Sequence, residues 1–192
     1  VVLLGSSGAG KTTLLNMLGG MDTITEGKIL FDGRDISHMS GFEMARYRRH
    51  DVGFVFQFYN LIPTLTAEEN IMLPWKLDGR KENKKRLTEM MQLLGLLERA
   101  KHLPGQMSGG QQQRVSIGRA LINEPAFILA DEPTGNLDSK TGREIMDILK
   151  LANQKYKQTI LLVTHDEKIA LQASRIITIG DGKIVKDEVV KS

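Results

Sequence analysis

The feature that most constrains the fold is the segment Gly5–Thr12, Gly-Ser-Ser-Gly-Ala-Gly-Lys-Thr, which matches the phosphate-binding pattern G-x-x-x-x-G-K-[ST]. An apolar run, Val1–Leu4, precedes it, and helical spacing follows over Lys11–Leu18. Glycines allow backbone angles that other side chains forbid, so successive N–H groups can turn inward around phosphate oxygens at the start of a helix. The predicted phosphate contacts are Gly5, Ser6, Ser7, Gly8, Ala9, Gly10, Lys11, Thr12 and Thr13.

Polar side chains of this loop and of one further segment suit phosphate and metal chemistry. Lys11 can reach the terminal phosphates as a point charge, and the Thr12 hydroxyl is placed to ligate Mg²⁺. The apolar run Phe127–Ala130 ends in Asp131 and Glu132. Because strand ends in open α/β sheets face the ligand crevice, Asp131 suits a Mg²⁺ ligand, direct or through water, and Glu132 a base that activates water.

Short apolar runs alternate with helical patterns along the chain, which predicts an α/β fold with a mainly parallel sheet. The expected strands after the first are Lys28–Phe31, Val52–Phe56, Phe127–Ala130, Thr159–Thr164 and a hairpin of Arg175–Ile179 with Lys183–Lys186. An amphipathic helix before Thr159–Thr164 begins at Asp138 or Ser139 as its N-cap.

Residues 66–123 differ from the rest, with helical spacing over Ala67–Leu77, Lys84–Leu94 and Gly109–Ile122 and few strand signals. We therefore predict one domain over 1–192, in which a helical subdomain (63–123) is inserted between two parts (1–62 and 124–192) of the α/β core.

Composition excludes several classes of protein. With no cysteine among the 192 residues, disulfides, thiol catalysis and Cys-ligated zinc are excluded. No apolar run approaches the roughly 18 residues that span a bilayer. Basic clusters at Arg46–His50 and Arg80–Arg86 favour solvated faces or a partner surface over nucleic-acid binding, because aromatic residues are only 5% and are not interleaved with them.

A second candidate anion site lies at Met107-Ser108-Gly109-Gly110-Gln111, which opens a predicted helix. Ser108 and Gln111 have capping-box spacing, which by itself indicates only a helix start. The two glycines cost about 1 kcal/mol each relative to alanine inside a helix. Since they carry no side chains, they leave the helix N-terminus open to an anion.

With this segment the chain resembles the ATP-binding cassette (ABC) family, whose L-S-G-G-Q signature appears as Met107–Gln111. Gln57 matches the family's Q-loop glutamine, Gly135-Asn136-Leu137-Asp138 its D-loop, and His165 its switch histidine. The resemblance covers essentially the whole chain, and the ordered set of motifs is highly specific.

The resemblance implies a P-loop ATPase that uses ATP and Mg²⁺ and works as a homodimer with two ATP molecules between protomers. Ser108, Gly109, Gly110 and Gln111 of one protomer would face the γ-phosphate held by Lys11 of the other, with Asp138 near the interface. His165 would hold the γ-phosphate and Glu132. Gln57 would contact the metal, sense the nucleotide and link it to a membrane subunit.

The segments Phe54–Asn70 and Pro133–Asp138 resemble ATPases of the lipoprotein-release, macrolide-export and bacitracin-resistance type. The resemblance implies an FtsX-like permease partner, a peripheral place on the cytoplasmic face of the inner membrane, and no nucleic-acid partner. Family members begin with further β structure that carries an adenine-stacking aromatic. We therefore expect this chain to be N-terminally truncated, with reduced stability or an exposed apolar face.

Three other readings remain open. Soluble cassette ATPases of DNA repair or chromosome structure usually carry a long coiled-coil insertion, whereas here a compact segment without sustained heptads fills that gap. Ribosome-associated cassette proteins have two cassettes in one chain, and this chain shows one. P-loop kinases have no use for the Ser108–Gln111 element.

Overall fold

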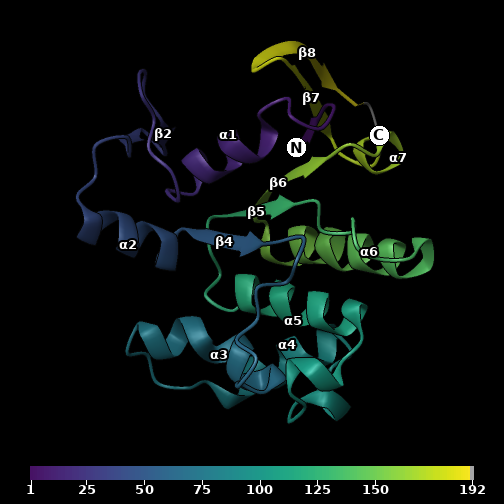
Figure 1. Cartoon of the computed structure of the whole chain (residues 1–192). Coiled ribbons are helices and arrows are strands. Elements are labelled where there is room, and N and C mark those ends of the chain that lie inside the picture. Colours follow the sequence, from purple (N-terminus) through teal and green to yellow (C-terminus); the bar gives the residue numbers. More distant parts are fainter. Residues whose placement is uncertain (191–192) are drawn as a thin grey trace.

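A computed structural model describes residues 1–190 (Figure 1). A six-stranded sheet in the order β4-β5-β6-β1-β7-β8 forms the centre, and a short hairpin, β2-β3, stands apart. The strands are β1 (Val2–Leu4), β2 (Leu30–Phe31), β3 (Arg34–Asp35), β4 (Val52–Val55), β5 (Phe127–Asp131), β6 (Thr159–Thr164), β7 (Arg175–Gly180) and β8 (Lys183–Val189). The helices are α1 (Lys11–Leu18), α2 (Gly41–His50), α3 (Ala67–Leu77), α4 (Lys84–Leu93), α5 (Gly109–Leu121), α6 (Ser139–Tyr156) and α7 (Glu167–Ala170), with 3₁₀ turns η1 (Leu97–Arg99) and η2 (Pro104–Gln106).

The sheet confirms the predicted α/β fold. All neighbours from β4 to β7 are parallel, and only β8 runs antiparallel, against β7. Parallel strands place their carboxyl ends on one edge, so the segments that follow β1, β4, β5 and β6 meet there. These segments contain the phosphate loop, Gln57, Glu132 and His165.

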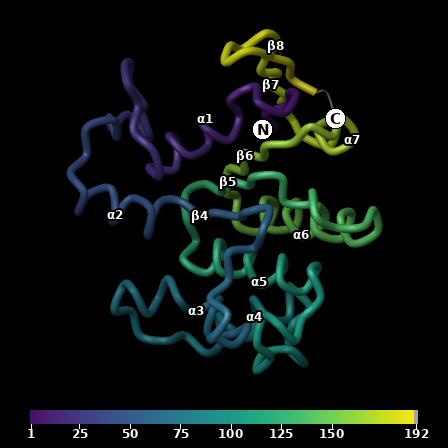
Figure 2. Tube along the Cα trace, viewed as in Figure 1, coloured from purple at the N-terminus to yellow at the C-terminus, as the bar shows by residue number. Residues whose placement is uncertain are grey.

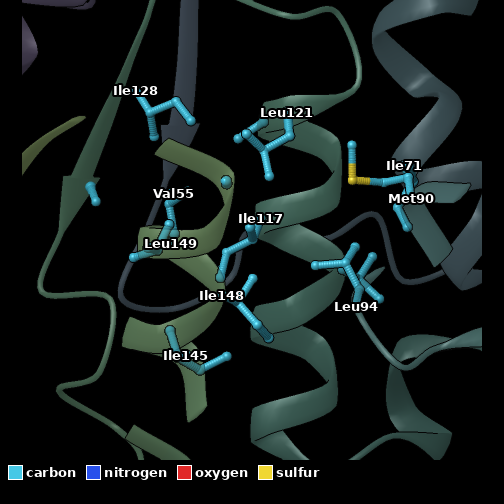
Figure 3. Packing of buried hydrophobic residues seen from close by; sticks show 14 of the residues in the cluster. Val55, Ile71, Met90, Leu94, Ile117, Leu121, Ile128, Ile145, Ile148 and Leu149 are labelled. Carbon is cyan, nitrogen blue, oxygen red and sulfur yellow. The ribbon is translucent and has the colours of Figure 1, made fainter. Parts of the chain in front are cut away.

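The helices α3, α4 and α5 gather on one side of the sheet, beyond α6, while the β7-β8 hairpin lies at the opposite end (Figure 1). Figure 2 traces the chain from β1 out to this helical part and back through β5 and β6. Both parts share one hydrophobic cluster (Figure 3), which joins Val55 and Ile128 of the sheet to Ile117 and Leu121 of α5 and onward to Met90 of α4. The subdomain boundaries remain a prediction, and residues 191–192 of the predicted range lie outside the described residues.

Two local predictions differ from the structure. The strand expected over Lys28–Phe31 is reduced to β2, which turns through Asp32 and Gly33 into β3; their φ angles of 48° and 75° are those of a tight hairpin turn. Helix α2 was not predicted. Ser40 and Glu43 form a capping box at its start, with the Glu43 N–H donating to Ser40 Oγ at 3.3 Å and the Ser40 N–H to Glu43 Oε2 at 2.8 Å.

The basic cluster Arg46–His50 forms the last turns of α2 and connects the sheet to the helical part. Arg48 donates to the Gly20 carbonyl at 2.6 Å, and Arg49 donates to the Leu77 carbonyl at 3.0 Å. His50 Nε2 lies 3.0 Å from Asp78, just after α3. Much of this positive charge therefore serves contacts within the chain. Within residues 1–190, no helix has the length and apolarity needed to cross a bilayer.

Candidate functional site

The phosphate loop lies between β1 and α1 and has the predicted backbone. Gly8 and Gly10 have φ angles of 81° and 92°, which an L side chain rarely adopts, and Gly10 is the N-cap of α1. Lys11 is buried, and its Nζ donates to the carbonyls of Gly5 and Ser6 at 2.8 Å each. The ammonium group is therefore held over the loop, beside the N–H groups that open α1.

A cavity of about 660 Å³ lies on this edge of the sheet; we call it the P-loop cavity. It brings together predicted side chains that are far apart in the sequence, and it also includes Val163, which was not predicted. The lining residues are Ser6, Ser7, Gly8, Gly10, Lys11, Thr12, Thr13, Gln57, Asp131, Glu132, Val163 and His165. Gly5 and Ala9 belong to the loop but not to this lining.

Thr12 and Asp131 fit a divalent cation. Thr12 Oγ1 donates to Asp131 Oδ1 at 3.2 Å, so a hydroxyl and a carboxylate oxygen share one wall of the cavity. Burial raises the pKa of Asp131, and the charge of neighbouring Glu132 adds to this, against the Thr12 hydrogen bond and Lys11. Hard cations such as Mg²⁺ prefer oxygen ligands, and a bound cation relieves a buried carboxylate charge. Within residues 1–190, no group of three or more histidine or acidic side chains could hold a metal by itself.

We expect Asp131→Asn to raise the melting temperature of the nucleotide-free protein at neutral pH. A carboxyl group whose pKa is higher in the folded than in the unfolded state destabilises the fold when ionised, and this cost disappears as the pH falls through the folded-state pKa. The asparagine can still accept from Thr12. Differential scanning fluorimetry across pH should therefore show that the difference in melting temperature between Asp131→Asn and the wild type becomes smaller as the pH falls.

The exposed Asp147→Asn on α6 is the matched control and should leave the melting temperature nearly unchanged. A melting temperature for Asp131→Asn below that of the wild type, or a difference between the two proteins that does not change with pH, would contradict this account.

Glu132 leaves β5 in a left-handed conformation, with φ of 43°. His165 Nδ1 lies 2.7 Å from Glu132 Oε1, and Thr164 Oγ1 donates to Glu132 Oε2 at 3.2 Å. The structure thus brings Glu132 and His165, two of the four predicted catalytic residues beside Lys11 and Gln57, into direct contact, and adds Thr164, which was not predicted. Such a carboxylate can accept a proton from a water molecule in the cavity.

Gln57 lines the same cavity and is paired with Asn136. Asn136 Nδ2 donates to the Gln57 carbonyl at 3.0 Å, and Gln57 Nε2 donates to Asn136 Oδ1 at 3.4 Å. Asn136 was not singled out from the sequence, although it lies inside the segment Gly135–Asp138 that was. The loop after β4 is therefore connected to the loop after β5 beside Glu132.

Arg119 of α5 binds the residues that follow Gln57. Its Nη1 donates to the Asn60 carbonyl at 2.6 Å and its Nη2 to the Tyr59 carbonyl at 2.9 Å. Tyr59 and Asn60 are both left-handed, with φ of 62° and 49°, and burial lowers the pKa of Arg119. No sequence signal pointed to Arg119, which lies near the C-terminal end of the largely buried helix α5.

The segment Ser108–Gln111 forms the predicted capping box of α5. The Ser108 N–H donates to Gln111 Oε1 at 3.0 Å, and the Gln111 N–H donates to Ser108 Oγ at 3.3 Å. Packing within the chain also requires a glycine at position 110, because a Cβ there would lie 2.4 Å from Thr141 Cγ2. Neither Ser108, Gly109, Gly110 nor Gln111 lines the P-loop cavity of its own chain.

Asp138 is the N-cap of α6, for which the sequence offered Asp138 or Ser139. It accepts from the N–H groups of Lys140 and Thr141 at 3.0 Å and from the Thr141 hydroxyl at 2.6 Å. These bonds, the Thr141 hydroxyl first, lower the pKa of Asp138. Like Ser108, Asp138 lies outside the P-loop cavity.

Comparison with known proteins gives matches along the whole chain. A family model described as "ABC transporter" matches residues 1–135. An uncharacterized ABC transporter ATP-binding protein of Thermotoga maritima is 49% identical over 96% of this chain and 79% of its own length. The macrolide export ATP-binding/permease protein MacB of Pasteurella multocida is also 49% identical, but this chain spans only 29% of its length.

The fold matches a solved structure equally well. A dimeric structure of a post-hydrolysis state of the ATP-binding cassette MJ0796 bound to ADP and Pi is 43% identical, with a TM-score of 0.90 over 100% of this chain and 85% of that one. A second dimeric structure of MJ0796, described as a bacterial ABC transporter cassette, has the same TM-score of 0.90 at 44% identity.

Proposed function

Because this chain belongs to the ABC transporter family and is an ATPase cassette of that family, we propose that it binds ATP between two copies of itself and drives a membrane permease. The main support for the dimer is the position of Ser108–Gln111. This segment begins helix α5 and can bind an anion, but it lies outside the P-loop cavity of its own chain. A second copy can bring this helix start to the phosphates. The dimeric MJ0796 structures, one of them with ADP and Pi, support the same arrangement.

In this proposal six side chains of the P-loop cavity have defined tasks. Lys11 and the N–H groups of the loop bind the phosphates, and Glu132 takes a proton from the attacking water. His165, whose Nδ1 lies 2.7 Å from Glu132 Oε1, holds that carboxylate until it contacts the terminal phosphate. Thr12, Asp131 and Gln57 are the residues that would hold Mg²⁺, which when bound neutralises charge on the phosphate oxygens.

The metal and the dimer can be tested together. In EDTA with saturating ATP, we expect hydrolysis to stop while light scattering still detects nucleotide-dependent dimers, because loop and signature contacts bind phosphate without the metal. Adding Mg²⁺ should restore hydrolysis.

At low protein concentration the specific activity should rise with concentration, since two copies form each site. A specific activity that is independent of concentration, with monomers throughout, would refute the shared site.

We further propose that the permease is of the FtsX-like class and that the protein works at the cytoplasmic face of the inner membrane. The identity to MacB sequences, which unite an ATP-binding part and a permease by name, supports a membrane partner. Phe58 follows Gln57 and is 73% exposed, which gives the nucleotide-sensing loop an apolar contact point.

Affinity-tagged full-length protein should recover a permease of the FtsX-like class from solubilised membranes, and Phe58→Ser should weaken that recovery. Phe42→Ser, at another exposed phenylalanine, serves as the control. Recovery of a permease of another class would overturn the subgroup, and recovery of ribosomes or DNA would favour a soluble cassette ATPase.

A further inference from the structure

The end of strand β6 lies directly beside Glu132. In the parallel register of β5 and β6, Asp131 is opposite Val163, so Glu132 and Thr164 are the next residues along the two paths of the chain. The Glu132 N–H continues the pairing by donating to the Val163 carbonyl at 3.0 Å. The left-handed turn at Glu132 then ends the strand, and its side chain returns toward β6.

Thr164 contributes a hydroxyl whose only proton has a defined direction. Its Oγ1 accepts from the Asp166 N–H at 3.1 Å and lies 3.2 Å from Glu132 Oε2. An ionised carboxylate can only accept, so the hydroxyl donates its proton to Oε2. Thr164 is only 1% exposed, and its β-branched side chain has restricted χ1 freedom, so this hydroxyl is fixed in place.

The two oxygens of Glu132 therefore have unlike partners. Oε2 is bound by the buried hydroxyl of Thr164, whereas Oε1 is bound by His165, whose side chain is 70% exposed. The exposed His165 can turn toward a phosphate, whereas the buried Thr164 hydroxyl is held by its two hydrogen bonds. Releasing His165 exposes Oε1 to the cavity without releasing the carboxylate.

We propose that Thr164 is a positioning residue for hydrolysis, which fixes the Glu132 carboxylate through Oε2 so that Oε1 faces the attacking water. This inference rests on the proposed function of Glu132 as the base. It gives different tasks to the last residue of β6 and to the residue that follows it: Thr164 orients the carboxylate at all times, and His165 contacts it only while no terminal phosphate competes.

The test compares Thr164→Val with Thr164→Ser in the full-length protein. Valine keeps the shape of threonine but removes the hydroxyl, and serine keeps the hydroxyl but removes a buried methyl group. We expect Thr164→Val to lower kcat by about ten- to a hundred-fold, because misplaced catalytic groups cost rates of this order, with KM for ATP and ATP-dependent dimers unchanged. Thr164→Ser should recover most of the wild-type kcat, because serine keeps the hydroxyl that donates to Glu132 and accepts from the Asp166 N–H.

Valine also leaves the Asp166 N–H without its acceptor, so the melting temperature of each variant is measured beside its kcat. Serine as the worse variant for turnover, or turnover that follows thermal stability in both variants, would overturn the proposal. Adding Thr164→Val to Glu132→Gln supplies a second readout. If Thr164 acts through Glu132, the double variant should hydrolyse ATP no more slowly than Glu132→Gln alone. Full additivity would also overturn it. If Glu132→Gln hydrolyses ATP at the wild-type rate, Glu132 is not the base and the proposed function is wrong on this point. If Glu132→Gln is slow but Thr164→Val hydrolyses ATP at the wild-type rate, only the positioning role of Thr164 is refuted.

Discussion

Replacing Glu132 by glutamine should reduce ATP hydrolysis by about two orders of magnitude or more, the contribution typical of a general base. Glutamine keeps the size of the side chain and an oxygen that can accept from Thr164, but it cannot take a proton from water. ATP binding should survive, because Lys11 and the loop N–H groups are untouched. Dimers should accumulate with ATP, since the step that separates them is blocked.

The measurements are the steady-state release of phosphate and the mass of the ATP-bound species by light scattering. Glu167→Gln, an exposed acid at the start of α7 two residues after His165, makes the same chemical change outside the cavity and should behave as wild type. Undiminished hydrolysis by Glu132→Gln would remove Glu132 from the role of base.

Mixing two inactive variants, Ser108→Arg and Lys11→Ala, should restore activity if the site is shared between copies. Arginine places a cation at the positive end of α5 and removes the N-cap hydroxyl, so the contact with phosphate is lost. In a mixed dimer, the Lys11 of one copy faces the Ser108 of the other, and one of the two sites is intact. Random pairing should then yield about a quarter of the wild-type rate for a two-fold dimer.

A matched control carries both substitutions on one chain and is mixed with wild-type protein. Its mixed dimers contain no intact shared site, so they should be inactive, whereas a site completed within one chain would leave one site working in each. Subunit exchange is followed by energy transfer between labelled copies. Wild-type homodimers alone leave about a quarter of the wild-type rate in the control, whereas sites completed within one chain would leave about half. A control rate of about half, with no activity in the first mixture and with exchange demonstrated, would show that Ser108 acts within its own chain.

Much of the fold follows from local signals. The phosphate loop is bounded by a short apolar run and a helix, and Gly180–Gly182 separates β7 from β8 as expected. Helix α2 went unpredicted because its polar sequence has no clear apolar stripe, although the Ser40–Glu43 capping box was readable. The β2-β3 hairpin was signalled by Asp32-Gly33, but two-residue strands are too short to show alternation.

The site was predictable where the functional residue lies in or directly after a recognisable local sequence pattern, as at Lys11, Asp131 and Glu132. Asn136 and Arg119 were not predictable, because their roles come from hydrogen bonds to residues 79 and 59 positions away. Thr164 is similar: only the register of β6 against β5 reveals that its hydroxyl meets Glu132. Such contacts depend on strand order, which local patterns do not determine.

The connection from Gln57 to Thr66 has no helix or strand, yet side chains from the loop after β5, from α5 and from the following helix α3 bind it. Asn136 and Arg119 bind its first half, and the fully buried Asn70 accepts from the Ile62 N–H at 2.8 Å and donates to the Leu65 carbonyl at 2.9 Å. A segment anchored in this way opens only when its anchors do. Proteases should therefore cut it slowly despite its surface position, and its anchored amides, such as Ile62, should exchange with deuterium at rates closer to those of α5 than to those of an ordinary loop.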